Sequence, residues 1–145
     1  MHVYAAAGTY TVSLTATGPG GSNTATRTGL ITVTSAPAIV NPVLAAPVPG
    51  TAGVNNTFTI TGCTPGSSVT LYIASATGTS FVTVGGVRVR SGLSQPTVLG
   101  SGIAGADGSV TLNINVNANL RGRTRRLQAF DGGSARFSNV VTERF

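Results

Sequence analysis

The 145-residue sequence contains no lysine and no tryptophan, one cysteine, one histidine and only three acidic residues. A single cysteine excludes an intrachain disulfide, and one Cys with one His cannot complete a tetrahedral metal site. Thr, Ser, Gly and Asn interrupt every apolar stretch before it reaches the length of a membrane-spanning helix. We therefore expect no intrachain disulfide, no metal, no cofactor and no transmembrane segment.

The shortage of acidic side chains also limits the chemistry that the chain could perform. The only carboxylates are those of Asp107, Asp131 and Glu143, and the only imidazole is that of His2. Both aspartates lie in glycine-containing turns, where Asp commonly bonds to nearby backbone. Calcium prefers six to eight oxygen ligands, which three scattered acids do not supply. We predict that the chain is not an enzyme and holds no calcium.

What the sequence does contain is β-strand patterning. Near the start, Tyr10, Val12 and Leu14 alternate with Thr and Ser, which is the two-residue period of a strand. The segment "GPGGSN" follows and is typical of a turn, and a second apolar stretch ends at Val33. Residues 1–34 are therefore predicted to form a β-hairpin, which alone is only marginally stable in water.

The rest of the chain divides into two sections. Residues 35–53 hold four of the seven prolines, which favours a linker or an edge segment over a central strand. Residues 54–145 alternate short strands with turns at the spacing of a β-sandwich, and Gly108 in "GADGS" is expected to take a positive φ. The strands are predicted at 56–61, 68–74, 80–84, 86–90, 97–103, 109–116, 124–130 and 136–142. No helical periodicity is present, so the fold class is all-β.

The first section resembles the end of a PKD domain, an Ig-like sandwich of bacterial and archaeal surface proteins. The resemblance rests on "HVY" at 2–4, "AGTYTVSLTAT" at 7–17 and "GLITV" at 29–33. It implies an incomplete Ig-like element, because the earlier strands of that fold have no counterpart in the sequence.

Residues 47–142 resemble a bacterial Ig-like domain of the kind found in adhesins and secreted enzymes. The matching segments are "TPGSSVTLY" at 64–72, "VLGSGIAGADGSVTLNI" at 98–114 and "LQAFDGGSARFSNVVT" at 127–142. The expected architecture is thus an Ig-like β-sandwich preceded by a PKD-type hairpin and a Pro-rich linker. Both resemblances imply spacers, stalks or binding platforms outside the cell, and neither implies catalysis.

Arginine supplies all the positive charge, and the net charge is +6. Four arginines gather in "RGRTRR" at 121–126, while Arg88 and Arg90 lie two apart and face one side of a strand. Arg125 and Arg126 are neighbours and should face opposite sides. Four interpretations stay open: nucleic-acid or phosphate binding, contact with acidic glycans or lipid headgroups, contact between subunits, and a solvated edge without a function.

The incomplete hairpin raises the question of what completes it. It could pack on its own second domain, it could continue upstream, or a neighbouring copy could supply the missing strands, as in donor-strand complementation. The third possibility also explains why no charged residue lies between Arg27 and Arg88. It predicts a subunit of a self-assembling surface filament, sheath or layer.

The residues expected to contact other subunits fall in three groups: an apolar hairpin face, an inserting segment and a polar group. They are Tyr10, Val12 and Leu14; Ile39, Val40, Val43 and Leu44; and Arg121, Arg123, Arg125 and Arg126. The alternative function is an adhesion or glycan-binding module of a larger secreted protein. It predicts a monomer that binds acidic glycans in a salt-sensitive way. Cys63 is expected to be a small buried apolar group, with interchain pairing as the alternative.

Overall fold

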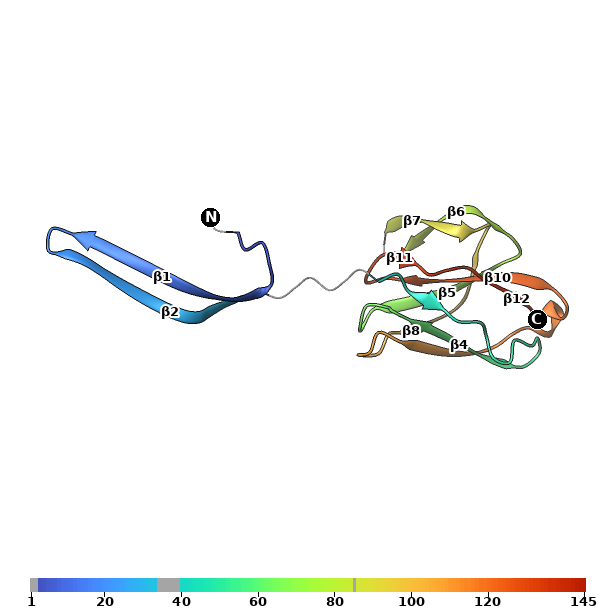
Figure 1. Cartoon of the computed structure of the whole chain (residues 1–145). Coiled ribbons are helices and arrows are strands. Elements are labelled where there is room, and N and C mark those ends of the chain that lie inside the picture. The colour runs from blue at the N-terminus through green and yellow to red at the C-terminus, as the bar shows by residue number, and fades with distance from the viewer. Residues whose placement is uncertain (1–2, 34–39, 85) are drawn as a thin grey trace. The chain divides into compact units, whose positions relative to one another are not determined.

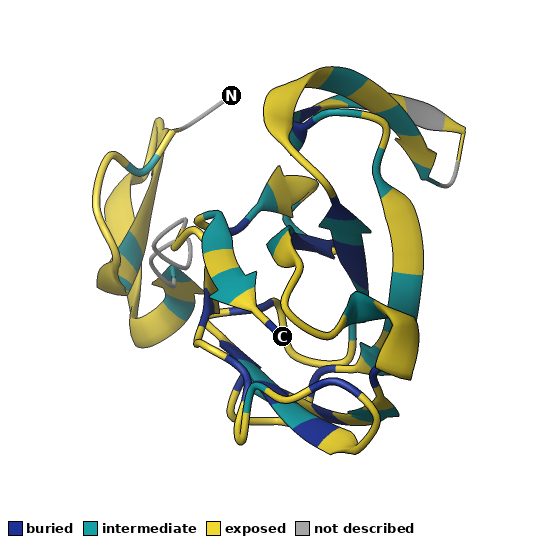
Figure 2. Ribbon diagram, turned by 90° about the vertical axis from the view of Figure 1, so that its right-hand side faces the viewer, coloured by how far each residue is buried: buried dark blue, intermediate teal, exposed yellow. Residues whose placement is uncertain are grey.

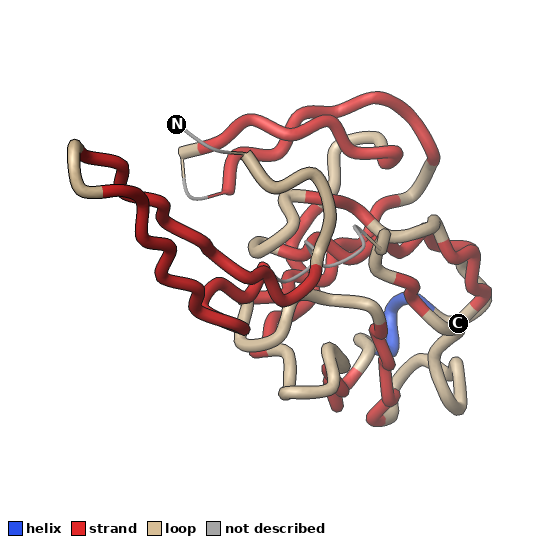
Figure 3. Tube along the Cα trace, turned by 60° about the vertical axis from the view of Figure 1, so that its left-hand side comes forward, coloured by secondary structure: helices blue, strands red, loops and turns tan. Residues whose placement is uncertain are grey.

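A computed structural model describes residues 3–33, 40–84 and 86–145. The chain divides into two compact units, Met1–Ala38 and Ile39–Phe145, and each is described here by itself. Almost all regular structure is β, as expected, and η1 is a single 3-10 turn (Figures 1 and 3). The elements are β1 Gly8–Gly18, β2 Gly21–Val33, β3 Val43–Leu44, β4 Asn55–Thr61, β5 Ser68–Ala74, β6 Thr77–Val84, β7 Val87–Leu93, β8 Thr97–Ile103, β9 Val110–Asn115, η1 Ala118–Leu120, β10 Thr124–Asp131, β11 Arg136–Phe137 and β12 Val141–Arg144.

The first unit is the antiparallel hairpin of β1 and β2. The pairing runs from Gly8 opposite Val33 to Gly18 opposite Gly21, with an irregularity between Tyr10 and Val12. Its residues are almost all exposed, whereas buried residues gather in the second unit (Figure 2). The hairpin therefore has no core of its own.

The second unit is a sandwich of two antiparallel sheets. One sheet has the order β3-β4-β9, and the other has the order β11-β10-β5-β8, with β12 also paired to β10. This arrangement is that of an Ig-like sandwich, in which strands that follow one another in the chain can belong to different sheets. Inward-facing residues alternate along each strand and form one core, which includes Phe58, Ile60, Leu71, Leu112 and Leu127.

A further hairpin, β6–β7, covers the outer face of the second sheet. Beneath it lies a second apolar cluster that includes Tyr72, Leu93 and Phe130. Strand β10 is consequently buried on both faces, with Leu127 in the first cluster and Phe130 in the second. This explains why the segment from Leu127 to Asp131 is buried without interruption.

Residues 40–53 run along the sandwich as part of the second unit. Val43 and Leu44 pair with β4, and a bridge joins Val48 to Thr57. Leu44 is only 2% exposed and belongs to the chain's own core. The prolines of this segment permit an edge position because the outer side of an edge strand needs no ladder hydrogen bonds.

Strand β8 approaches β9 closely where the two sheets meet. A Cβ atom added at Gly100 would lie 2.6 Å from Ile114 Cδ1, and one added at Gly102 would lie 2.8 Å from Leu112 Cδ2. Glycine at both positions allows this backbone to pack directly on the side chains of the other sheet.

Candidate functional site

The two faces of the β1–β2 hairpin differ in chemistry. On one face, hydroxyl side chains pair across the strands: Ser13 with Thr26 at 3.0 Å and Thr15 with Thr24 at 2.8 Å. These pairs satisfy each other's hydrogen bonds and stay exposed to water. This face suits solvent rather than a packed layer.

The opposite face carries the predicted apolar row. Tyr10 and Val12 are half-buried, while Leu14 is 71% exposed and lies opposite Ala25. Arg27 lies opposite Val12 and so borders the row on the same face. The Tyr10 ring contacts Tyr4 in a tilted arrangement with centroids 4.4 Å apart and an interplanar angle of 42°, and its hydroxyl donates to Ala6 O at 2.6 Å. In residues 3–33 the sheet has only these two strands, so no second sheet of this unit covers the row.

The outer edges of the hairpin also lack partner strands within the described residues of the first unit. Strand β1 is 11 residues long and contains neither charge nor proline. Such an edge presents a row of N–H and C=O groups that can pair with another strand. The apolar row and this edge together make the hairpin the candidate site for association.

The structure describes only part of the segment that was expected to insert into a neighbouring copy. Ile39 lies outside the described residues. Val40 and Val43 are exposed, and Leu44 is buried in the chain's own core. Leu44 is therefore packed within its own sandwich and is not available for contact with a neighbouring copy.

The predicted arginines gather where β10 begins. Arg121 and Arg123 are exposed, and Arg125 and Arg126 are half-buried. The register of β10 with β12 brings a residue that the sequence reasoning missed, Arg144, opposite Thr124. We call residues 121–126 and 143–145 the arginine ribbon. No local sequence signal identified Arg144, because strand pairing alone places it there.

Each of the three carboxylates accepts hydrogen bonds from the protein itself. Asp131 is fully buried and accepts hydrogen bonds from the backbone and hydroxyl of Thr64, from the Ser67 hydroxyl, and from the amides of Gly133 and Ser134. Burial by itself would raise the pKa of Asp131, but the hydrogen bonds from Ser67, Ser134 and Thr64 outweigh it and hold the pKa well below its usual value. This aspartate therefore has a structural role.

The other two carboxylates also bond locally. Asp107 accepts from the amide and the hydroxyl of Ser109, and these bonds lower its pKa. Glu143 accepts from the amide of Arg144 at 3.2 Å. Among the described residues, no group of three or more His, Cys, Asp or Glu side chains is placed to hold a metal ion.

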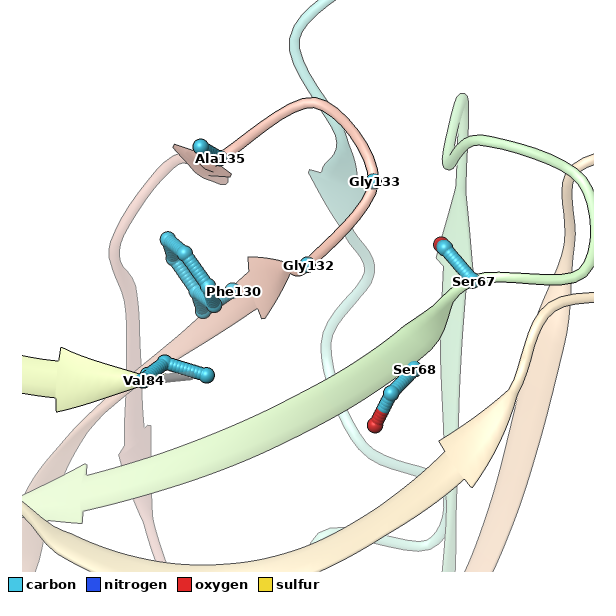
Figure 4. A pocket seen from close by; sticks show the side chains of 7 residues that line it. All are labelled: Ser67, Ser68, Val84, Phe130, Gly132, Gly133 and Ala135. Atoms are coloured by element: carbon cyan, nitrogen blue, oxygen red, sulfur yellow. The ribbon is translucent and has the colours of Figure 1, made fainter. Parts of the chain in front are cut away.

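Two surface hollows lie beside the second apolar cluster. One, of about 450 Å³, is lined by Phe130 and Val84 together with small residues of two turns, Ser67, Ser68, Gly132, Gly133 and Ala135 (Figure 4). The other, of about 440 Å³, is lined by Asn41, Pro42, Val43, Phe137, Ser138 and Asn139. Neither lining includes a titratable side chain, so neither hollow supplies acid–base chemistry.

One of three comparisons with known proteins found a match. Residues 1–30 match the family model of the PKD domain. The comparisons with curated proteins and with solved structures found no match. In the part of the chain that the structure describes, no helix has the length and hydrophobicity needed to cross a membrane.

The match covers most of the first unit and none of the sandwich. It confirms the predicted PKD-type element at the N-terminus. PKD domains are non-catalytic Ig-like modules that are typically extracellular. The second unit has an Ig-like fold, and its resemblance to one bacterial Ig-like family stays a prediction.

Proposed function

We propose that the chain is a non-enzymatic structural module of an extracellular assembly and that it associates with copies of itself through the β1–β2 hairpin. The observation that carries this proposal is the apolar row of Tyr10, Val12 and Leu14 on a two-stranded sheet. A two-stranded sheet with an apolar face gains stability when a further strand or layer covers it.

Strands of a neighbouring copy are a suitable cover. Strand β1 contains no charged residue, and the one charged residue of β2 is Arg27, opposite Val12. If each copy supplies strands to the next, the contact is head-to-tail and builds a filament unless it closes into a ring. Val40 and Val43 of the second unit are exposed apolar residues, and we assign them to a contact with a neighbouring copy as well.

The test measures molecular mass by light scattering and inspects the same sample by negative-stain electron microscopy. The variant Val12→Thr/Leu14→Thr makes two of the three residues of the apolar row polar, and threonine is β-branched, which suits a strand. The matched control, Ser13→Thr/Thr15→Ser, exchanges hydroxyl residues on the opposite face of the same strand.

We expect the unaltered chain and the control to form oligomers or filaments, and V12T/L14T to be largely monomeric. A monomer for the unaltered chain at all concentrations would contradict the proposal. Equal assembly of V12T/L14T would contradict it too, because the apolar row would then have no part in association.

A further inference from the structure

We propose that the arginine ribbon, residues 121–126 and 143–145, binds an anionic polysaccharide through the exposed side chains of Arg121, Arg123 and Arg144. The ribbon forms because Thr124 pairs with Arg144 and Arg125 pairs with Glu143. Beyond the paired strands, Phe145 N donates to Arg123 O at 3.3 Å, and Gly122 N donates to Phe145 O. Two stretches of chain about twenty residues apart in sequence are thus held side by side.

The charge of the ribbon is not neutralised from within. It contains five arginines and one acidic residue, Glu143, whose carboxylate accepts a hydrogen bond from the backbone of Arg144. Arg125 donates to Thr124 O at 3.2 Å, which is a neutral acceptor. Guanidinium groups without carboxylate partners form a local positive field that attracts polyanions.

The exposed arginines of the ribbon lie at or next to an edge of the second sheet. Strand β12 pairs with β10 and with no other strand among the described residues, so it is an edge of the second sheet. Arg125 and Arg126 are adjacent in β10 and therefore face opposite sides of it. Because Arg126 is half-buried and its Nη1 atom is buried, a linear anionic chain lying along this edge would meet chiefly the exposed side chains of Arg121, Arg123 and Arg144. The planar guanidinium matches the paired oxygens of carboxylate or sulfate groups.

A second copy of this chain is a poor partner for the ribbon. Each copy has only three acidic side chains, and Asp131 is fully buried. Only Asp107 and Glu143 of a neighbour could face several arginines, so a second copy offers the ribbon few carboxylate partners. An anionic polysaccharide therefore suits the ribbon better than the subunit contact that was predicted from the sequence for these arginines.

Single-stranded nucleic acid is also disfavoured, because its binding sites use exposed aromatic rings as stacking platforms. The aromatic residue of the ribbon, Phe145, is buried in the core. The nearest aromatics in sequence, Phe130 and Phe137, belong to the second apolar cluster. Polysaccharides carry their charge on flexible chains without bases to stack, so they require only the arginines.

The test uses the full chain, with a heparin fragment as the sulfated probe and oligogalacturonate as the carboxylate probe, in titration calorimetry. Arg123→Gln/Arg144→Gln removes two exposed charges from the ribbon. Arg88→Gln/Arg90→Gln removes two exposed charges from β7 and is the matched control, since the loss of net charge is the same. Measurements in the V12T/L14T background separate this proposal from self-association, because they do not depend on assembly.

We expect binding of at least one probe that weakens steadily as salt rises, and a loss of about tenfold in affinity for R123Q/R144Q. The R88Q/R90Q control should stay within about twofold of the unaltered chain. Equal losses for both variants would overturn the proposal, because the effect would then follow net charge alone. Absence of binding to both probes at low salt, or tighter binding of a single-stranded DNA of equal charge, would overturn it as well.

Discussion

The side-chain amide of Asn139 forms hydrogen bonds with both backbone groups of Leu44: Leu44 N donates to Oδ1 at 2.8 Å, and Nδ2 donates to Leu44 O at 3.1 Å. The amide therefore takes the place that a neighbouring strand would occupy beside β3. It joins the edge of one sheet to the loop between β11 and β12 of the other. Since β3 is only two residues long, this side chain supplies much of its lateral support.

Asn139→Ala should therefore loosen the edge of the sandwich. We expect the free energy of unfolding to fall by about 1–2 kcal/mol, because two backbone groups of a buried residue lose their partner. Urea denaturation followed by fluorescence or circular dichroism measures this. Asn113→Ala is the control, since Asn113 is exposed and accepts only one bond, from the Thr57 hydroxyl. A control loss equal to that of Asn139→Ala would show that the paired amide contact has no special weight.

Asp131 makes stability depend on pH. Its pKa is lower in the folded chain than the unperturbed 3.8, so its contribution is fully present above that value and is lost as the pH falls below it. Asp131→Asn should cost about 3 kcal/mol at neutral pH, because the amide cannot accept all five hydrogen bonds. The variant should also lose less stability between neutral pH and about pH 3. Unfolding curves at both pH values that keep the same difference between variant and parent would contradict this.

Cys63 should be unreactive while the chain is folded. Burial, aided by the negative charge of Asp131, raises the pKa of this thiol to about 11, so little thiolate exists at neutral pH. We expect a thiol-specific disulfide reagent to label it slowly in buffer and rapidly in urea. Non-reducing electrophoresis should show no disulfide-linked dimer. Fast labelling of the folded chain, or a linked dimer, would restore the interchain pairing considered from the sequence.

Gly108 has the positive φ that was predicted from "GADGS", with a value of 72°. A Cβ atom at this position would lie 2.5 Å from Cys63 O, so Gly108→Ala adds a backbone clash to the strain of a left-handed residue. Gly66→Ala is the matched control, since Gly66 has φ 74° and open space around it. We expect a loss of about 1 kcal/mol for the control and a larger loss for Gly108→Ala, measured by thermal unfolding. Equal losses would mean that the backbone at Cys63 moves away from the added Cβ atom without a loss of stability.

Local pattern identified most strands but not where they break. The sequence predicted one strand over 136–142, whereas the structure has β11 at Arg136–Phe137 and β12 at Val141–Arg144. The interruption falls at residues whose hydrogen bonds go elsewhere: Ser138 O accepts from Gln128 Nε2, and Asn139 bonds to Leu44. Alternation in the sequence cannot reveal such a break, because the competing partners lie far away along the chain.

One of the two candidate sites could be predicted from the sequence, and the other could not. The alternation of Tyr10, Val12 and Leu14 was sufficient to predict that these three residues lie in a row on one face, since every second side chain of a strand faces the same side. The arginine ribbon needed the structure, because only the pairing of β12 with β10 brings Arg144 beside Arg123.

Sequence alone was sufficient to predict the all-β class, the hairpin and the turn at Gly108, because these depend on local periodicity and backbone preference. Only the tertiary structure decided that Leu44 packs into its own sandwich, that β6–β7 covers a second apolar cluster, and that Asp131 is a buried acceptor of five hydrogen bonds. These features depend on which distant segments meet, and that choice is made by the burial of apolar surface over the whole domain.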